Sequence, residues 1–208
     1  MKSFIDHLVI TAPDLESGCD YVFQQLGVRP QPGGEHERMG THNRLLKLSD
    51  TLYLEVIAVN PQSLPVGRPR WFELDNISDN VKPKLVTWVV RTTDIQAAAK
   101  ESPVSLGNIE PMNRGDLNWF ITIPEDGVML MDGMMPTLIQ WQTASHPASR
   151  LLDNNCSLIT LEIFHPQSIL LSNFLKAISF SGNVIIKSAE TFKIVAHIQT
   201  AKGVCLLT

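Results

Sequence analysis

Runs of apolar residues, which predict strands, alternate along the chain with short amphipathic stretches, which predict helices. The stretch from Phe4 to Thr11 predicts a strand, and Asp14 is a good N-cap for a helix directly after it. In that helix the apolar positions recur every three or four residues, and Gly27 stands where a helix commonly ends. The positions that share this apolar face are Leu15, Cys19, Val22 and Leu26.

The same order of elements returns twice further along the chain. From Leu85 a strand leads to the polar cap Asp94 and to an Ala-rich helix that Pro103 ends. From Ser157 a strand leads to Pro166, a favourable residue for a first helical turn, and to a third helix. The apolar face of that helix is formed by Leu171, Phe174, Leu175 and Ile178.

Short strand candidates separated by turn residues follow each helix, so each unit is predicted to be βαβββ. These strands are expected at 44–48 and 51–59, at 117–123 and 137–142, and at 184–187, 192–199 and 204–207. The predicted organisation is a first module at 1–60, an ordered crossover loop at 61–84, a second module at 85–143, and a third, C-terminal βαβββ-like segment at 144–208 packed on the same domain.

The crossover loop is rich in proline and polar residues but also carries Trp71 and Phe72. Two interpretations are open for this pair. The favoured one is that the aromatic rings pin the loop to the sheet, and the other is that the loop carries function. His146, which precedes Pro147, is predicted to shape a turn.

Composition excludes several classes of protein. The 208 residues carry a net charge of −4, so no overall basic field attracts nucleic acid. The N-terminal apolar stretch is interrupted by Asp6 and His7, which indicates neither a secretory signal nor a membrane span, and a cytoplasmic protein is predicted. The three cysteines are scattered, which disfavours a disulfide framework and a thiolate zinc site. The chain also lacks nucleotide-binding, α/β-hydrolase and zincin motifs.

Several motifs resemble the vicinal oxygen chelate superfamily and, within it, the glyoxalase-like domain proteins. They are DHLVI at 6–10, GGEHERMGTHNRLLKL at 33–48, YLEVIAV at 53–59, GRPRWFELDN at 67–76, LIQW at 138–141, HPA at 146–148 and LITLEIFHP at 158–166. The resemblance implies an α+β fold whose repeated βαβββ modules form curled mixed sheets around a cup, with a third partial module at the C-terminus. It also implies a divalent metal held between modules by a His on the first strand and a Glu on the fourth strand of each.

His7 and Glu55 are the candidate metal ligands of the first module. By the two-residue period of a strand, each shares a face with apolar neighbours, so both point toward the predicted cup. A buried carboxylate needs a cation, a donor or a proton, and Zn, Ni, Mn or Fe would suit this pair. Alignment of the second module on its cap, Asp94 against Asp14, places Thr87 at the His7 position, and LIQW places Gln140 where YLEV has Glu55. Gln140 is therefore the third predicted ligand, and a hydrogen-bonded pair without any ion is the alternative.

Without a metal, the cup becomes an apolar pocket in which Glu55 acts as a general base or accepts a hydrogen bond from the ligand. Arg70 and Arg114 are predicted to bind an anionic or carboxylate-bearing ligand through their guanidinium groups. The alternative for each arginine is an ordinary surface position. The other predicted ligand-binding residues are His36 and Asn43 at the rim, Gln140, and Trp119 and Trp141 as a stacking wall.

The function predicted from these residues is a glyoxalase-like protein that binds a small polar organic molecule, with or without a metal. Lyase, isomerase or hydrolase chemistry would have Glu55 move a proton, while methylglyoxal lyase activity is disfavoured by the altered second-module ligands. The alternatives are a non-catalytic binding or sequestering protein of the same fold and an interaction module with a vestigial cup. A small molecule and a second copy of the chain are the predicted partners. The sequence leaves the ligand, the metal, the reaction and the oligomeric state open.

Overall fold

The first strand and helix form where the capping residues predict them. In the computed structural model, which describes residues 1–208, β1 (Ser3–Thr11) leads to α1 (Leu15–Leu26). The Asp14 carboxylate accepts a hydrogen bond from the backbone N–H of Ser17, and the N–H of Gly27 donates to the Phe23 carbonyl. Gly27 has a φ of 76°, a conformation that glycine adopts without strain, so the helix ends there.

The remaining elements complete two modules and a C-terminal segment. The first module adds β2 (Gln31–His36), β3 (Thr41–Ser49) and β4 (Leu52–Val59). The second contains β5 (Lys84–Thr92), α2 (Ile95–Lys100), β6 (Asn108–Arg114), β7 (Leu117–Ile123) and β8 (Thr137–Trp141). The C-terminal segment contains β9 (Ser157–Phe164), α3 (Ser168–Ala177), β10 (Val184–Lys187), β11 (Lys193–Thr200) and β12 (Gly203–Leu207). None of these helices is both long enough and apolar enough to cross a membrane.

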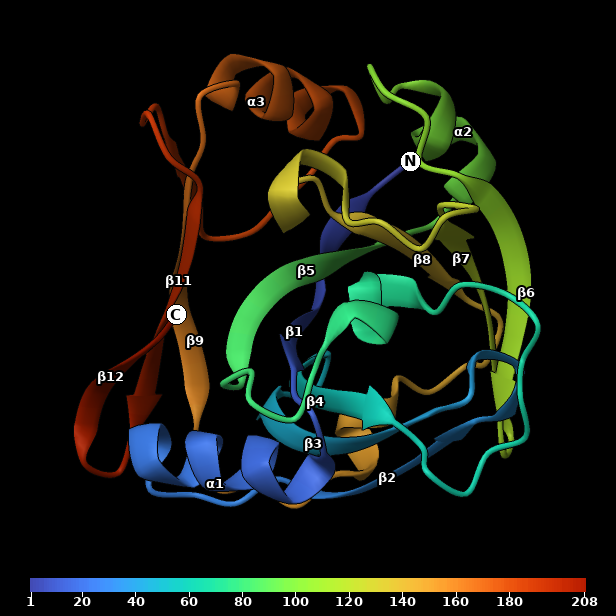
Figure 1. Cartoon of the computed structure of the whole chain (residues 1–208). Helices are drawn as coiled ribbons and strands as arrows, with labels where there is room; N and C mark the ends of the chain where they lie inside the picture. The colour runs from blue at the N-terminus through green and yellow to red at the C-terminus, as the bar shows by residue number, and fades with distance from the viewer.

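The two modules share one curved sheet of eight strands, in the order β2-β3-β4-β1-β5-β8-β7-β6. In each module the first strand runs parallel to the last, β1 beside β4 and β5 beside β8. The modules join where β1 and β5 pair antiparallel. Figure 1 shows this sheet curving around the short helical segment η2 (Trp71–Asn76) of the crossover loop. The predicted fold class, paired βαβββ modules in a curled mixed sheet, is confirmed.

The C-terminal segment keeps the βαβββ order but pairs its strands differently. Its four-stranded sheet has the order β10-β9-β11-β12, so β9 lies between β10 and β11 instead of beside the last strand. The segment packs on the modules through their shared apolar core, in which Phe174 of α3 joins Leu8 of β1 and Trp88 of β5. The backbone N–H of Leu85 also donates to the carbonyl of Thr208.

The eight-stranded sheet is buried on both faces. Because successive strand residues point to opposite sides, Leu8 belongs to the large cluster on the helix-covered face, while Val9 belongs to a second cluster on the concave face. Trp71 and Phe72 are buried in the concave cluster, and η2 is anchored there by a hydrogen bond from the Glu73 N–H to the Gly127 carbonyl. The loop aromatics therefore do pin the crossover loop to the sheet.

Candidate functional site

The concave face of the eight-stranded sheet contains a hollow with one polar and one aromatic side. The space inside it that a water molecule could enter is about 20 Å³, and all the space between its walls, including the part that opens to solvent, is about 340 Å³. Its polar side chains are those of His7, His36, Glu55 and Arg114, and Trp119 and Trp141 belong to its aromatic wall. A neighbouring space on the other side of Trp71 and Phe72 is lined by no titratable side chain. The candidate chemistry therefore lies in the first hollow.

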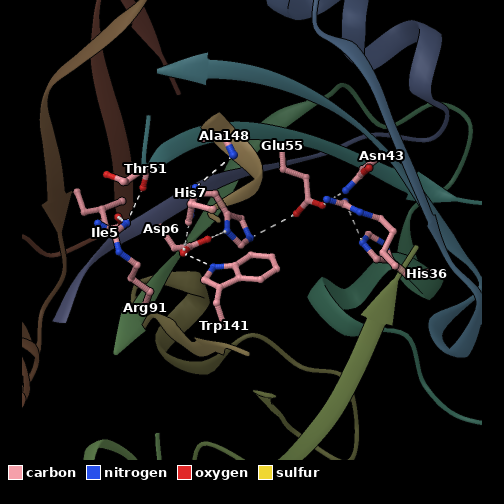
Figure 2. A network of polar contacts seen from close by, with 12 residues as sticks. Ile5, Asp6, His7, His36, Asn43, Thr51, Glu55, Arg91, Trp141 and Ala148 are labelled. Carbon is pink, nitrogen blue, oxygen red and sulfur yellow. Dashed lines mark hydrogen bonds and ion pairs between the residues drawn. The ribbon is translucent and has the colours of Figure 1, made fainter. Parts of the chain in front are cut away.

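The structure brings together the imidazole of His7 and the carboxylate of Glu55. Nε2 of His7 lies 3.6 Å from Oε2 of Glu55, and both residues are only 4% exposed. The His7 ring stacks on the ring of Tyr53 with centroids 4.5 Å apart. Figure 2 shows the two side chains facing each other from β1 and β4. The two side chains therefore lie together in one hollow, as the sequence predicts.

Asp6 lies behind His7 and fixes its orientation. Its fully buried carboxylate contacts Nδ1 of His7 at 2.7 Å, accepts a hydrogen bond from Nε1 of Trp141 at 2.8 Å and contacts Nε2 of His146 at 3.0 Å. Burial raises the pKa of Asp6, but the hydrogen bonds from His146 and His7 outweigh it and hold that pKa well below its usual range. An ionised carboxylate only accepts hydrogen bonds, so Nδ1 of His7 carries its hydrogen and Nε2 faces Glu55.

A β-bulge explains how two consecutive residues serve one site. The register of β1 against β5 shifts between Ile5 and His7, so the alternation of side chains is interrupted at Asp6. The guanidinium of Arg91 donates to the carbonyls of Ile5 and Thr51 and holds the backbone beside the bulge (Figure 2). Strict alternation would place Asp6 and His7 on opposite faces of the strand, so from the sequence Asp6 was predicted only as an interruption of an apolar stretch.

His146 has a second role in addition to the turn predicted for it. Its Nδ1 accepts a hydrogen bond from the Ala148 N–H at the start of η4 (Pro147–Arg150), as a turn-shaping residue does. Its Nε2 is therefore the protonated nitrogen and donates to Asp6. The end of β8 and the segment after it are thus attached to the buried carboxylate, by Trp141 and His146 respectively.

Asn43 supports Glu55 from the other side. The amide group of Asn43 donates to Oε1 of Glu55 at 2.5 Å (Figure 2). The amide oxygen of Asn43 accepts from the backbone N–H of Gly34 at 2.9 Å. A side chain on Gly33 would stand 2.0 Å from the Asn43 oxygen, so the glycine pair makes room for this contact. Asn43 was predicted to bind ligand at the rim. Here it is buried behind Glu55 and positions the carboxylate.

His36 and Arg114 meet where the two edge strands β2 and β6 end. The nearest guanidinium nitrogen of Arg114 lies 3.5 Å from Nε2 of His36, and Nδ1 of His36 is 3.1 Å from the Thr41 hydroxyl. Burial, with the nearby charge of Arg114, holds the pKa of His36 well below its ordinary value, so the ring is neutral. Neither edge strand was predicted as a strand, but both side chains do line the hollow.

Gln140 does not face the hollow, and the register of the second module explains why. Its side-chain oxygen accepts from the backbone N–H of Ile95 at 2.8 Å, at the start of α2 on the other face of the sheet. Pairing in β5 and β8 places Val89 and Ile139 at the positions that correspond to His7 and Glu55. The sequence alignment was displaced by one residue in β8, and such a displacement turns a side chain to the opposite face.

Arg70 also lies outside the hollow. Its guanidinium forms an ion pair with Asp75 at 2.5 Å, and its backbone N–H donates to the same carboxylate. It holds the crossover loop instead of binding a ligand there. Three aromatic residues that were not predicted as ligand-binding also line the hollow, namely Tyr53, Trp71 and Phe72. Alternation along β4 places Tyr53 on the same face as Glu55, so its position in the hollow could have been predicted from the sequence.

The side chains do not fit a resident divalent metal. Members of the superfamily commonly use such metals, held by ligands from both modules. Here the second module supplies Val89 and Ile139, and the chain has no group of three or more His, Cys, Asp or Glu side chains placed to hold an ion. His7 and Glu55 alone are too few ligands for a structural or catalytic site. The predicted metal set of His7, Glu55 and Gln140 is therefore not assembled.

The fold and the hollow together define a protein of the vicinal oxygen chelate type, two βαβββ modules in one curved sheet with polar side chains on its concave face. The model of the glyoxalase-like domain family matches residues 5–178, and the chain belongs to this family.

Comparison with one solved structure supports the same fold, and two more distant similarities are also found. A crystal structure of a hypothetical protein from Staphylococcus aureus superposes with a TM-score of 0.69 at 17% identity, covering 98% of this chain and 93% of that one. A methylmalonyl-CoA epimerase in complex with methylmalonyl-CoA has a TM-score of 0.45 at 20% identity, covering 69% and 97%. A mutant of 4-hydroxymandelate synthase from Streptomyces coelicolor has 0.47 at 12% identity, covering 97% and 60%. No functionally curated protein sequence matches the chain.

Proposed function

We propose that the chain binds a small polar organic molecule in the concave hollow and transfers a proton to and from it without a metal. The observation that supports this most directly is the His7–Glu55 pair. Because Asp6 keeps a hydrogen on Nδ1 of His7, Nε2 of the ring faces the Glu55 carboxylate at a distance of 3.6 Å. The imidazole nitrogen and the carboxylate are both groups that can hold a proton between them.

Such a pair suits isomerase or lyase chemistry at a carbon next to a carbonyl. Glu55 is the proposed general base, and Asn43 holds its carboxylate in one orientation. His7 shares the abstracted proton and returns it, while the aromatic wall excludes water from the hollow. A cytoplasmic location and assembly as a homodimer remain predictions that accompany this function.

Hydrogen–deuterium exchange tests the proposal. The purified protein is incubated in D₂O with a panel of small ketones and 2-oxo acids, and loss of the proton next to each carbonyl is followed by NMR. Glu55→Gln should slow enzyme-dependent exchange about 100-fold or more, as expected for loss of a general base. Glu162→Gln is the matched control, because Glu162 is paired with Lys187 and His197 on the separate four-stranded sheet.

A chelator should leave the exchange rate unchanged, and metal analysis should find no stoichiometric ion. Loss of exchange on chelation would contradict the metal-free mechanism.

A non-catalytic binding protein is the second candidate. The observation in its favour is the aromatic enclosure of the hollow. Four indole or phenyl rings line it beside the His7–Glu55 pair, which is almost fully buried. Saturable binding of a panel member without any exchange in the wild-type protein would favour this candidate over catalysis.

A further inference from the structure

Three tryptophans line the hollow, and they differ in what their N–H groups contact. The indole of Trp141 donates to Asp6, so its polar atom is satisfied. The indole nitrogens of Trp71 and Trp119 are buried and have no hydrogen-bond partner. A buried donor without a partner is destabilising, and such donors are rare in folded proteins. Both rings line the hollow, so an acceptor atom of a bound ligand would be a partner for these donors.

Arg114 is a third donor in the same place. It lines the hollow, is partly buried, and forms no ion pair with any carboxylate of the chain. Its one hydrogen-bond partner is the neutral ring of His36 at the long distance of 3.5 Å. In contrast, Arg68 and Arg38 are both paired with Glu110 on the same strand as Arg114. The stem of Arg114 lies against Gly34, where any side chain would stand 2.7 Å from it.

The His36 ring places these three donors together. The edge of His36 meets the ring of Trp71 at 5.1 Å between centroids and that of Trp119 at 6.1 Å, and Arg114 contacts its Nε2. Figure 2 shows His36 on the far side of Glu55 from His7. Arg114 and the Trp71 ring therefore lie beside His36, while the Trp119 ring extends from His36 toward Trp141, with centroids 5.3 Å apart. Because His36 is neutral, Arg114 supplies an uncompensated positive charge there.

We propose that this end of the hollow binds a carboxylate group of the ligand, held by the guanidinium of Arg114 and the indole N–H groups of Trp71 and Trp119. This assignment rests on the proposed function and deepens it, because it makes the substrate class a small organic acid. A carboxylate accepts several hydrogen bonds and matches the guanidinium fork. The negative charge of Glu55 disfavours the acid group at the other end, so the ligand binds in one direction.

Matched pairs of ligands test the assignment. The pairs are benzoate with benzamide and pyruvate with pyruvamide, whose members differ in charge but hardly in shape. Binding is followed by intrinsic fluorescence, since three of the four tryptophans line the hollow, and by calorimetry. Each acid should bind the wild-type protein at least 10-fold more tightly than its amide.

Variants separate the three donors. Arg114→Gln should weaken acid binding at least 10-fold and amide binding less than 2-fold, and Arg114→Lys should restore part of the loss. Trp71→Phe and Trp119→Phe keep an aromatic ring but remove the N–H, and each should weaken acid binding about 3- to 10-fold. Arg150→Gln is the control, because Arg150 is exposed and paired with Asp116 outside the hollow.

Equal affinity for acids and amides, absence of acid binding, or an equal effect of Arg114→Gln on both ligands would overturn the assignment. Glu55→Gln separates it from the proposed function. That variant should lose exchange but bind the acids at least as well as the wild type. Acid binding without exchange in the wild type would therefore reject catalysis alone, and exchange without preference for acids would reject the carboxylate site alone.

Discussion

Replacement of Asp6 by asparagine should reverse the tautomer of His7. The Asp6 oxygen Oδ2 accepts from both Trp141 and His146, while Oδ1 faces Nδ1 of His7. An asparagine has only one acceptor oxygen, and the Trp141 indole can only donate. The amide oxygen must therefore stay toward Trp141 and His146, and the NH₂ group must face His7. Nδ1 of His7 then has to accept, which moves its hydrogen to Nε2, toward Glu55.

The cost in stability follows from the same contacts. A hydrogen bond to a charged group contributes about 1.5–3 kcal/mol and a neutral one about 0.5–1.5 kcal/mol, so each of the three bonds loses about 1 kcal/mol. Part of this loss is offset because a buried amide costs less desolvation than a buried carboxylate. We expect Asp6→Asn to lower the free energy of unfolding by about 2 kcal/mol. Asp6→Leu leaves the Trp141 and His146 donors unpaired and should cost about 4 kcal/mol.

Two measurements check this prediction. Urea denaturation gives the free energies of unfolding of the wild type and both variants. Long-range ¹⁵N–¹H NMR shows which ring nitrogen of His7 carries hydrogen, and proton exchange on ligands should fall in Asp6→Asn although Glu55 is intact. If the variant folds with the hydrogen still on Nδ1, or if asparagine and leucine cost the same, the role given to Asp6 is refuted.

Three further predictions concern the surroundings of the hollow. His36 has a lowered pKa, so below about pH 6.5 the unfolded chain binds a proton that the folded chain does not. The free energy of unfolding should therefore fall as the pH falls, by up to about 1.4 kcal/mol per pH unit. Urea denaturation between pH 7 and 5.5 should show that the free energy of unfolding depends less steeply on pH in His36→Gln than in the wild type. Gly127→Ala should lower the melting temperature far more than Gly67→Ala, because both have positive φ but only at Gly127 would the new carbon meet the Arg70 carbonyl oxygen, at 2.2 Å. Asn43→Asp places a second carboxylate against Glu55, so it should destabilise the fold by about 2 kcal/mol at pH 7 and recover toward pH 5, as denaturation at the two pH values would show.

Local signals were enough to predict the modules. Asp14 and Asp94 cap helices as expected, each accepting a hydrogen bond from the N–H three residues later, and Gly27 ends the first helix. These features depend on a few neighbouring residues, so a single sequence contains the information. The edge strands β2 and β6 were missed because they carry glycines, prolines and charged residues instead of an alternating apolar pattern.

The site was predictable only where alternation holds without interruption. The contact between His7 and Glu55 was predictable because alternation along each strand indicates which face each side chain occupies. His36 was predicted from a motif, and Arg114 from its residue type. Asp6 depends on a bulge, and Gln140 on a register that no local residue specifies. The contribution of Trp71 depends on how a long loop folds back over the sheet, which the loop's own composition does not determine.

The difference between the two modules determines what the hollow can do. A metal centre at the junction needs ligands from both halves, but the second module offers Val89 and Ile139 where the first offers His7 and Glu55. The second module instead contributes Trp119, Trp141 and Arg114, which are side chains that enclose and orient a ligand. In the proposed function the first module, with Asp6 and Asn43 behind its titratable pair, contributes the side chains that hold and move a proton. A ligand bound between the two modules would have the proton-transfer pair of the first module on one side and the anchoring side chains of the second module on the other. That separation is what a metal-free proton transfer requires, since orientation then replaces the polarisation that a cation supplies.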